Sequence, residues 1–235
     1  VYENVFVHYT MKQWGTTPEQ IDPNTTARVP VFLSRDCRYF QDAYQGMPLS
    51  GYTPLFQRML DHPNIEVRLG VNALDLLDLR GDELLFEDEP FTGPVIYTGA
   101  ADELFGCVFG RLPYRTLDFK FETLPTDYFQ THGTVNYTVD EDFTRITEFK
   151  HMTGQRQTGV TTIVKEYSRP YTGAIGETPY YAIINDENNA LYGRYAALAA
   201  RHGNLHLLGR LAEYKYYNMD AIVARALALS DDLLK

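Results

Sequence analysis

Hydrophobic and polar positions alternate most clearly in the middle of the chain. From Thr116 to Glu122 the alternation is strict, as in a strand with one buried face and one wet face. Three more strand-like runs follow at 134–138, 143–149 and 160–167, separated by turn-rich stretches. This spacing predicts an antiparallel sheet over residues 114–167.

Shorter strand patterns precede this region, within residues 64–110. Ile65–Leu69 alternates, and Leu84–Glu87 is a second short run. The stretch 91–98 contains the continuous apolar run Pro94–Tyr97, which predicts a buried strand, and the small residues after it are typical of a turn that faces a ligand.

Helical signals dominate residues 1–63. Thr17-Pro18-Glu19-Gln20 has the pattern of a capping box with proline at the first helical position. Thr53-Pro54 opens a helix predicted from Leu55 to Asp61, and His62-Pro63 closes it. The segment 34–51 is expected to begin as a helix and to end as a loop.

Residues 186–235 predict a helix, a strand and a helix. The first helix spans Asn188–Arg201, Leu205–Leu208 is a short buried strand, and Asn218 can cap the last helix. One face of that helix is apolar, with Ile222, Ala226, Leu229 and Leu233. The pattern as a whole predicts a mixed α/β (α+β) fold.

Composition narrows the classes of partner. The chain has 235 residues and a net charge of −10, so it repels nucleic acid at long range, and we expect no nucleic-acid partner. No apolar run is long enough for a membrane span, and the two cysteines stand in no metal or redox spacing, so we expect a cytoplasmic protein without a metal site. The 18 tyrosines suit either ligand grooves or a strand-rich core.

Two clusters of candidate binding residues lie near the start of the chain. Tyr9, Thr10 and Trp14 can bind a nucleobase by stacking and hydrogen bonding, although a tryptophan that anchors helix packing is the favoured interpretation from the segment alone. The stretch 28–40 contains Arg28, several further arginines and Tyr39, which can clamp a diphosphate. Asp36 and Asp42 can equally pair with these arginines on a solvated surface.

Two further candidates come from the predicted sheet. Arg145 shares a strand face with Phe143, Thr147 and Phe149, so its charge requires a partner, either a ligand phosphate or Glu148 or Asp142 folding round. The pair Tyr180-Tyr181 lies ahead of a polar turn and can reach phosphate oxygens, or can simply end a strand before a helix cap.

The strongest local signal runs from Gly209 to Asp220, where a strand, a Gly-Arg turn, a tyrosine cluster and a helix start occur in order. A helix N-terminus favours phosphate or a flavin, whereas a strand–loop–helix link with a tyrosine-rich surface is the plainer interpretation. The sequence contains no Gly-x-Gly-x-x-Gly, no Gly-x-Ser-x-Gly and no zinc spacing.

Taken together, these strings resemble the UDP-galactopyranose mutases. The colinear carriers of the resemblance are Tyr9 to Gly15, Arg28-Val29-Pro30, Arg38-Tyr39-Phe40, Tyr44 to Pro48, Gly51 to Thr53, Tyr97-Thr98-Gly99, Leu112 to Arg115, Thr144-Arg145, Pro179 to Tyr181, and Gly209 to Asp220. Members of that family open with a Gly-rich FAD-binding segment, which this sequence lacks. The chain begins at Val1 and is therefore expected to be a fragment of a longer protein, inactive by itself.

The resemblance implies a domain plan and an activity. Residues 1–63 would be a helical substrate region, 64–110 and 186–235 parts of a Rossmann-like FAD domain, and 111–185 the sheet domain. The activity would be the interconversion of UDP-galactopyranose and UDP-galactofuranose through a flavin N5–sugar adduct with reduced FAD, in galactofuranose biosynthesis for cell-surface polysaccharide. A homodimer is an open possibility.

The resemblance also assigns roles to residues. Arg28 and Arg145 would neutralise the diphosphate, and Tyr181 and Tyr216 would donate to it, which makes these four the implied catalytic residues. Tyr9, Thr10 and Trp14 would bind the uridine, and Tyr39 and Asn136 would also contact substrate. The implied FAD contacts are Val71, Gly209, Arg210, Asn218, Met219 and Asp220.

Two departures from the family pattern bear on activity. Asn218 stands where the family commonly has aspartate, and Phe32 where a cation is common. Asparagine caps a helix but carries no negative charge beside a flavin. The alternatives to a mutase are a non-enzymatic UDP-sugar-binding fragment and a related FAD-dependent amine oxidase, which would not explain so many cations for an anionic ligand.

Overall fold

The chain folds into two compact units in the computed structural model, which describes residues 2–21, 33–36, 38 and 40–235. Unit 1 comprises residues 1–18, 23–69 and 117–169, and unit 2 comprises 19–22, 70–116 and 170–235. Helices and strands occur in both units, which confirms the predicted mixed class. The functional assignment of the three predicted domains stays a prediction.

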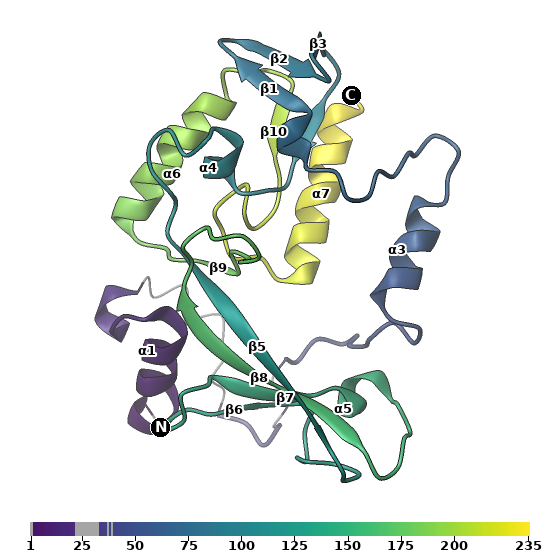
Figure 1. Ribbon diagram of the computed structural model, residues 1–235, viewed down its shortest axis with the longest axis vertical. Helices are drawn as coiled ribbons and strands as arrows, with labels where there is room; N and C mark the ends of the chain where they lie inside the picture. Colours follow the sequence, from purple (N-terminus) through teal and green to yellow (C-terminus); the bar gives the residue numbers. More distant parts are fainter. Residues whose placement is uncertain (1, 22–32, 37, 39) are drawn as a thin grey trace. The chain divides into compact units, whose positions relative to one another are not determined.

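Unit 1 combines short helices with most of an antiparallel sheet (Figure 1). The bounds of its elements are η1 Tyr2–Val7, α1 His8–Trp14, α3 Tyr52–Leu60, β6 Thr134–Asn136, β7 Arg145–Glu148 and α5 Phe149–Thr153. Two longer strands, β5 Tyr114–Leu124 and β8 Thr161–Pro170, begin or end in unit 2. The order of the sheet is β6-β7-β8-β5-β9.

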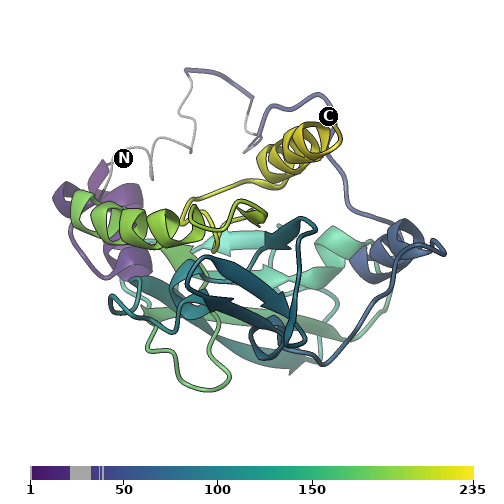
Figure 2. The same cartoon turned by 90° about the horizontal axis from the view of Figure 1, so that it is seen from above.

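Unit 2 contains a small antiparallel meander, a parallel strand pair and two long helices. Its elements are η3 Ala73–Asp75, β1 Leu77–Arg80, β2 Glu83–Phe86, β3 Glu89–Pro90, β4 Val95–Tyr97, α4 Ala101–Leu104, β9 Tyr181–Ala182, α6 Asp186–Ala199, β10 Leu205–Leu207 and α7 Met219–Leu233. A further short helix is η2 Pro18–Gln20. In Figures 1 and 2, α7 is the long yellow helix that follows the turn after β10 and runs to the C-terminus.

Local chemistry accounts for several boundaries. Gly15 ends α1 in the left-handed conformation at φ 70°, where its N–H donates to the Met11 carbonyl at 2.8 Å. Asn185 caps α6, because its side chain accepts a hydrogen bond from the Asn188 N–H at 2.8 Å. The predicted capping box at 17–20 yields only one 3₁₀ turn.

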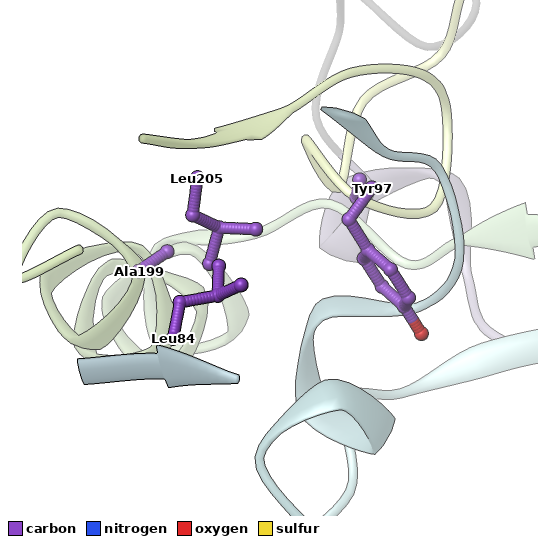
Figure 3. Packing of buried hydrophobic residues seen from close by; sticks show 5 residues of the cluster. Leu84, Tyr97, Ala199 and Leu205 are labelled. Carbon is purple, nitrogen blue, oxygen red and sulfur yellow. The ribbon is translucent and has the colours of Figure 1, made fainter. Parts of the chain in front are cut away.

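Buried apolar side chains from strands and helices make two clusters in unit 2. Figure 3 shows Leu84 of β2, Ala199 of α6 and Leu205 of β10 pointing toward one another, with Tyr97 of β4 beside them. The second cluster contains Ala101, Leu112, Tyr114, Tyr195 and Tyr214. These three tyrosines are at most 2% exposed, so part of the tyrosine content belongs to the core and not to a ligand groove.

Three local predictions differ from the structure. Ile65–Leu69 forms no strand, since its residues are exposed and have no paired strand beside them. The described part of 34–51 contains no helix, so the predicted helical start of that segment is wrong within the described residues. The strand at 116–122 is confirmed as β5, but its apolar face is not uniformly buried: Leu117 is 8% exposed, whereas Phe121 is 65% exposed.

The other predicted strands and helices occur at or near their expected positions. The strands at 84–87, 134–138, 143–149, 160–167 and 205–208 correspond to β2, β6, β7, β8 and β10, and the helices at 55–61, 188–201 and after 218 correspond to α3, α6 and α7. Within the described ranges, none of the helices combines the length and the apolar composition needed to cross a bilayer.

Candidate functional site

Arg145, at the start of β7, is the centre of a polar group in unit 1. Its Nη2 donates to the Tyr9 hydroxyl at 2.6 Å, and its Nε lies 3.4 Å from Oε2 of Glu166 on β8. The side chain of Arg145 is 26% exposed and that of Glu166 only 12% exposed. The guanidinium is therefore fixed from two sides while part of it stays open to solvent, which suits an anion-binding arginine.

Glu166 is the partner that sequence reasoning missed. The sequence suggested Glu148 or Asp142, but strand register places Glu166 directly opposite Arg145 and Asn136 on the other side of it. Directly opposed residues share a sheet face, so the three form one row across β6, β7 and β8. The sequence predicted a strand at 160–167, but the register that selects Glu166 depends on the pairing of β7 with β8. Burial raises the pKa of Glu166, and the nearby Arg145 opposes that rise.

Glu148 has a different task. Its fully buried carboxylate accepts from the Thr161 hydroxyl at 2.6 Å and from the backbone N–H groups of Phe129 and Gln130 at 3.0 and 2.9 Å. These bonds fix the turn before β6 to the sheet. Glu148 is therefore a structural anchor and not the counter-ion of Arg145.

Helix α1 carries the predicted uridine residues. Thr10 and Trp14 are buried, at 4% and 8% exposure, and Tyr9 is half-buried against Arg145. The buried indole agrees with the helix-packing interpretation. Nucleobase binding by this helix stays a prediction, and Tyr9 is the member that the structure connects to the candidate anion site.

A second group lies in unit 2, at the turn after β10. The Arg210 guanidinium carbon is 4.4 Å from the ring centroid of Tyr216 and 5.5 Å from that of Tyr181. Such cation–π contacts contribute about 0.5–2 kcal/mol each. Gly209, at φ 109°, makes the turn, and its N–H donates to the Glu213 carboxylate at 3.0 Å. Three predicted site residues thus meet in one cluster, and one of them, Tyr181, comes from a separate segment of the chain.

The start of α7 holds three more of the predicted residues. Asn218 occupies the N-cap position, as predicted, but its side chain accepts no hydrogen bond from the helix. Met219 is 64% exposed and Asp220 is exposed. A 15-residue helix whose start is open to solvent provides positive potential for an anionic group. Val71, half-exposed ahead of η3, belongs to the same unit.

Tyr214, in the middle of the C-terminal string, is a core residue. Its hydroxyl donates to the carbonyls of Pro113 at 2.6 Å and Ile183 at 3.1 Å, and burial raises its pKa. Two tyrosines of that string therefore differ: Tyr216 faces Arg210, and Tyr214 secures the fold.

Two predicted residues, Arg28 and Tyr39, lie outside the described residues. Nearby, Arg38 makes a 2.6 Å ion pair with Asp36, whose pKa falls to about 2 mainly because of the hydrogen bond from the Arg38 side chain. For Arg38, this pair agrees with the interpretation that the arginines of the segment pair with nearby aspartates on the surface.

The described residues contain no cluster of three metal-ligating side chains. Convergence of the two groups on one cleft stays a prediction.

Comparison with known proteins gives a consistent family. The family model described as UDP-galactopyranose mutase matches residues 4–216. A UDP-galactopyranose mutase of Mycoplasma pneumoniae is 40% identical over 98% of this chain and 59% of its own length, and one of Mycoplasma genitalium is 37% identical over 98% and 58%. A dTDP-fucopyranose mutase of Escherichia coli is 36% identical over 100% of this chain and 61% of its own length.

The chain spans about 60% of the length of the curated relatives it matches. The family match extends through α1, the sheet with Arg145 and the Arg210 turn, so both polar groups lie inside it. The chain belongs to the UDP-galactopyranose mutase family.

Proposed function

We propose that this chain is part of a flavin-dependent mutase that interconverts the pyranose and furanose forms of a nucleoside-diphosphate sugar, with UDP-galactose as substrate. The observation that carries the proposal is the partly open Arg145 guanidinium, oriented by Tyr9 and Glu166 inside a chain of the mutase family. An arginine held in this way binds a diphosphate without first losing side-chain freedom. A location in the cytoplasm, where nucleotide sugars are made available, is part of the proposal.

The residues of unit 2 support a role for FAD. Arg210 with its two tyrosine rings, and the uncapped start of α7, fit a planar group that carries negative charge. No Gly-x-Gly-x-x-Gly for the dinucleotide phosphates occurs in this sequence, so these residues fit only part of the cofactor. When bound, reduced FAD would supply a nucleophile at N5 for the anomeric carbon of the sugar.

The protein's own residues would manage the leaving diphosphate. Arg145, together with Arg28, would neutralise the negative charge that develops when the bond between sugar and diphosphate breaks. Tyr181 and Tyr216 would donate hydroxyl hydrogen bonds to the same group, and Asn136 would contact the substrate beside Arg145. Keeping the diphosphate close lets it return to the rearranged sugar.

Calorimetry with UDP tests the anion site on the chain itself. We expect UDP to bind, and Arg145→Ala to weaken binding by about tenfold or more, since a hydrogen bond to a charged group contributes about 1.5–3 kcal/mol. Arg169→Ala is the matched control, because Arg169 also lies on the sheet but pairs with Asp118 on the exposed surface at 2.8 Å. Equal losses in both variants, or no UDP binding by the unaltered chain, would contradict the proposal.

Activity is tested on the FAD-loaded protein that contains this chain. The protein is incubated with reduced flavin and UDP-galactofuranose, and chromatography of the products should show conversion to UDP-galactopyranose. Conversion no faster than in buffer would refute the mutase activity. UDP binding without FAD binding would instead support a sugar-nucleotide-binding module.

A second substrate is favoured by one observation. The dTDP-fucopyranose mutase relative is almost as similar to this chain as the UDP-galactopyranose mutases are. Competition between UDP and dTDP in the same calorimetric experiment separates the two: tighter binding of dTDP would assign the fucose nucleotide as the substrate.

A further inference from the structure

Lys12 on α1 makes an unusual set of contacts within unit 1. Its Nζ donates to three backbone carbonyls, those of Tyr137 at 2.6 Å, Glu141 at 2.9 Å and Phe143 at 3.2 Å. A lysine ammonium has three N–H donors, so this set engages its full donor capacity. All three acceptors belong to the connection between β6 and β7, more than 120 residues away in sequence.

This connection leads directly into the candidate anion site. It closes as the Tyr137 N–H donates to the Thr144 carbonyl at 2.9 Å, and Arg145 follows at once as the first residue of β7. Tyr9 lies three residues before Lys12, which puts both side chains on one side of α1. Lys12 and Tyr9 therefore attach the same helix to the same strand entry, one through the loop and one through Arg145.

The carboxylates in the loop favour the charged form of Lys12. Burial lowers the pKa of Lys12, and the carboxylates of Glu141, Asp140 and Asp142 in the same loop oppose that shift. The ammonium thus holds an acidic loop by its backbone, and an uncharged side chain of similar length would supply neither the donors nor the attraction.

Two further side-chain hydrogen bonds hold α1 and the segment that precedes it. The Ser168 hydroxyl donates to the Gln13 carbonyl at 2.7 Å, which ties α1 to β8. Thr138 reaches back to the Asn4 carbonyl at 2.7 Å, ahead of α1. The three hydrogen bonds of Lys12 join α1 itself to the loop 137–143, and Tyr9 on the same helix contacts Arg145 directly after that loop.

We propose that Lys12 is a positioning residue for the anion site: it holds α1 against the β6–β7 connection, so that Tyr9 orients Arg145 for the diphosphate. The inference rests on the proposed function, because UDP is the ligand whose binding reports the orientation. Contact between a guanidinium and a diphosphate depends on the orientation of the guanidinium. Loss of the Lys12 contacts would shift Tyr9 and so weaken diphosphate binding by Arg145.

The test compares UDP affinity with the amount of folded protein. In calorimetry of the 235-residue chain, Lys12→Met should weaken UDP binding by about tenfold at unchanged stoichiometry. A residue that only stabilises the fold would lower the stoichiometry or the melting temperature and leave the affinity of the folded molecules alone. Lys150→Met is the matched control, since buried Lys150 also donates to loop carbonyls, those of Asp127 at 3.1 Å and of Gln157, but on α5.

A double substitution tests the route through Tyr9. If Lys12 acts by placing Tyr9 against Arg145, Tyr9→Phe and Lys12→Met together should weaken UDP binding by clearly less than the product of the two single effects. Independent, multiplying effects would overturn the positioning role.

The remaining outcomes are also decisive. No UDP binding by the unaltered chain refutes the proposed function, whereas UDP binding that Lys12→Met leaves unchanged refutes only the inference. Should Lys12→Met fail to fold, Lys12→Arg takes its place in the test. Arginine keeps the charge, but its N–H donors lie in one plane and cannot donate to three carbonyls arranged around a single nitrogen. We then expect a smaller loss of affinity, and an unchanged affinity in folded Lys12→Arg would reject the role of Lys12.

Discussion

At the scale of single residues, buried polar groups decide what the candidate site can be. Arg145 is useful because Tyr9 and Glu166 hold it without covering it. Glu148, three residues later, is fully enclosed by donors and serves the fold. Two charged residues on one short strand thus have opposite tasks, and the difference comes from their neighbours and not from their type.

Glu148 makes the stability of unit 1 depend on pH. Burial alone would raise its pKa, but the hydrogen bonds from Thr161, Phe129 and Gln130 outweigh that effect and hold the pKa below its usual value. A carboxyl whose pKa is lower in the folded state stabilises the fold above the unfolded value of about 4.3. We expect this contribution to be lost as the pH falls from that value through the folded pKa.

Thermal unfolding followed between neutral and acidic pH tests this linkage. Glu148→Gln should lower the melting temperature at neutral pH, because its amide presents N–H groups to existing donors, at a cost of about 1–3 kcal/mol. The variant should also lose less stability on acidification than the unaltered chain. Exposed Glu66, paired with Arg68 on the surface, provides the control Glu66→Gln, and an equal acid response in all three proteins would contradict the assignment.

At the scale of elements, the two long helices of unit 2 both have asparagine at the N-cap, but the two asparagines differ in their hydrogen bonds. Asn185 caps α6 through its side chain, whereas Asn218 stands at the N-cap of α7 without such a bond. The start of α7, where the family resemblance expects the flavin, is exposed. The start of α6 is closed and serves stability.

Substitution of these two asparagines by alanine should therefore have unequal effects. Asn185→Ala removes a cap and should cost about 1 kcal/mol, which lowers the melting temperature by roughly 2–4 °C in a protein of this size. Asn218→Ala should change the melting temperature much less. Scanning calorimetry of both variants without ligand checks the difference, and a larger loss for Asn218→Ala would show that its side chain does cap α7.

At the scale of the whole molecule, the chain has two compact units and about 60% of the length of its relatives. Apolar side chains remain on its surface, among them a stripe on α7 formed by Met219, Val223 and Leu227 at 64%, 56% and 63% exposure. Residues four apart lie on one helix face, so these three form a continuous patch. Such a patch favours contact with another protein surface.

We expect the chain to self-associate through this stripe, in line with the homodimer that the resemblance leaves open. Light scattering after size-exclusion chromatography over a concentration series should show a rising mass. Val223→Glu combined with Leu227→Glu should keep the mass at that of one chain, while Ala228→Glu, at an exposed position on another face of the same helix, should not. A single-chain mass at all concentrations would contradict the expectation.

Much of the secondary structure could be predicted because it depends on neighbours in sequence. The alternation at 116–122, the helix predicted at 188–201 and the N-cap position of Asn218 are local patterns, and the structure has the corresponding elements. Ile65–Leu69 shows the limit, because alternation without a partner strand forms no strand.

The sequence by itself determined the resemblance to the mutase family and the mixed α/β class. It also identified Arg145, Arg210 and the tyrosines as candidate site residues. Only the tertiary structure decided which of them meet. It paired Arg145 with Glu166 through strand register, brought Arg210 against the rings of Tyr181 and Tyr216, and assigned Tyr214 and Glu148 to the fold. The physical reason is that a side chain's charge and shape are local properties, whereas its burial and its partners depend on segments that fold beside it from far along the chain.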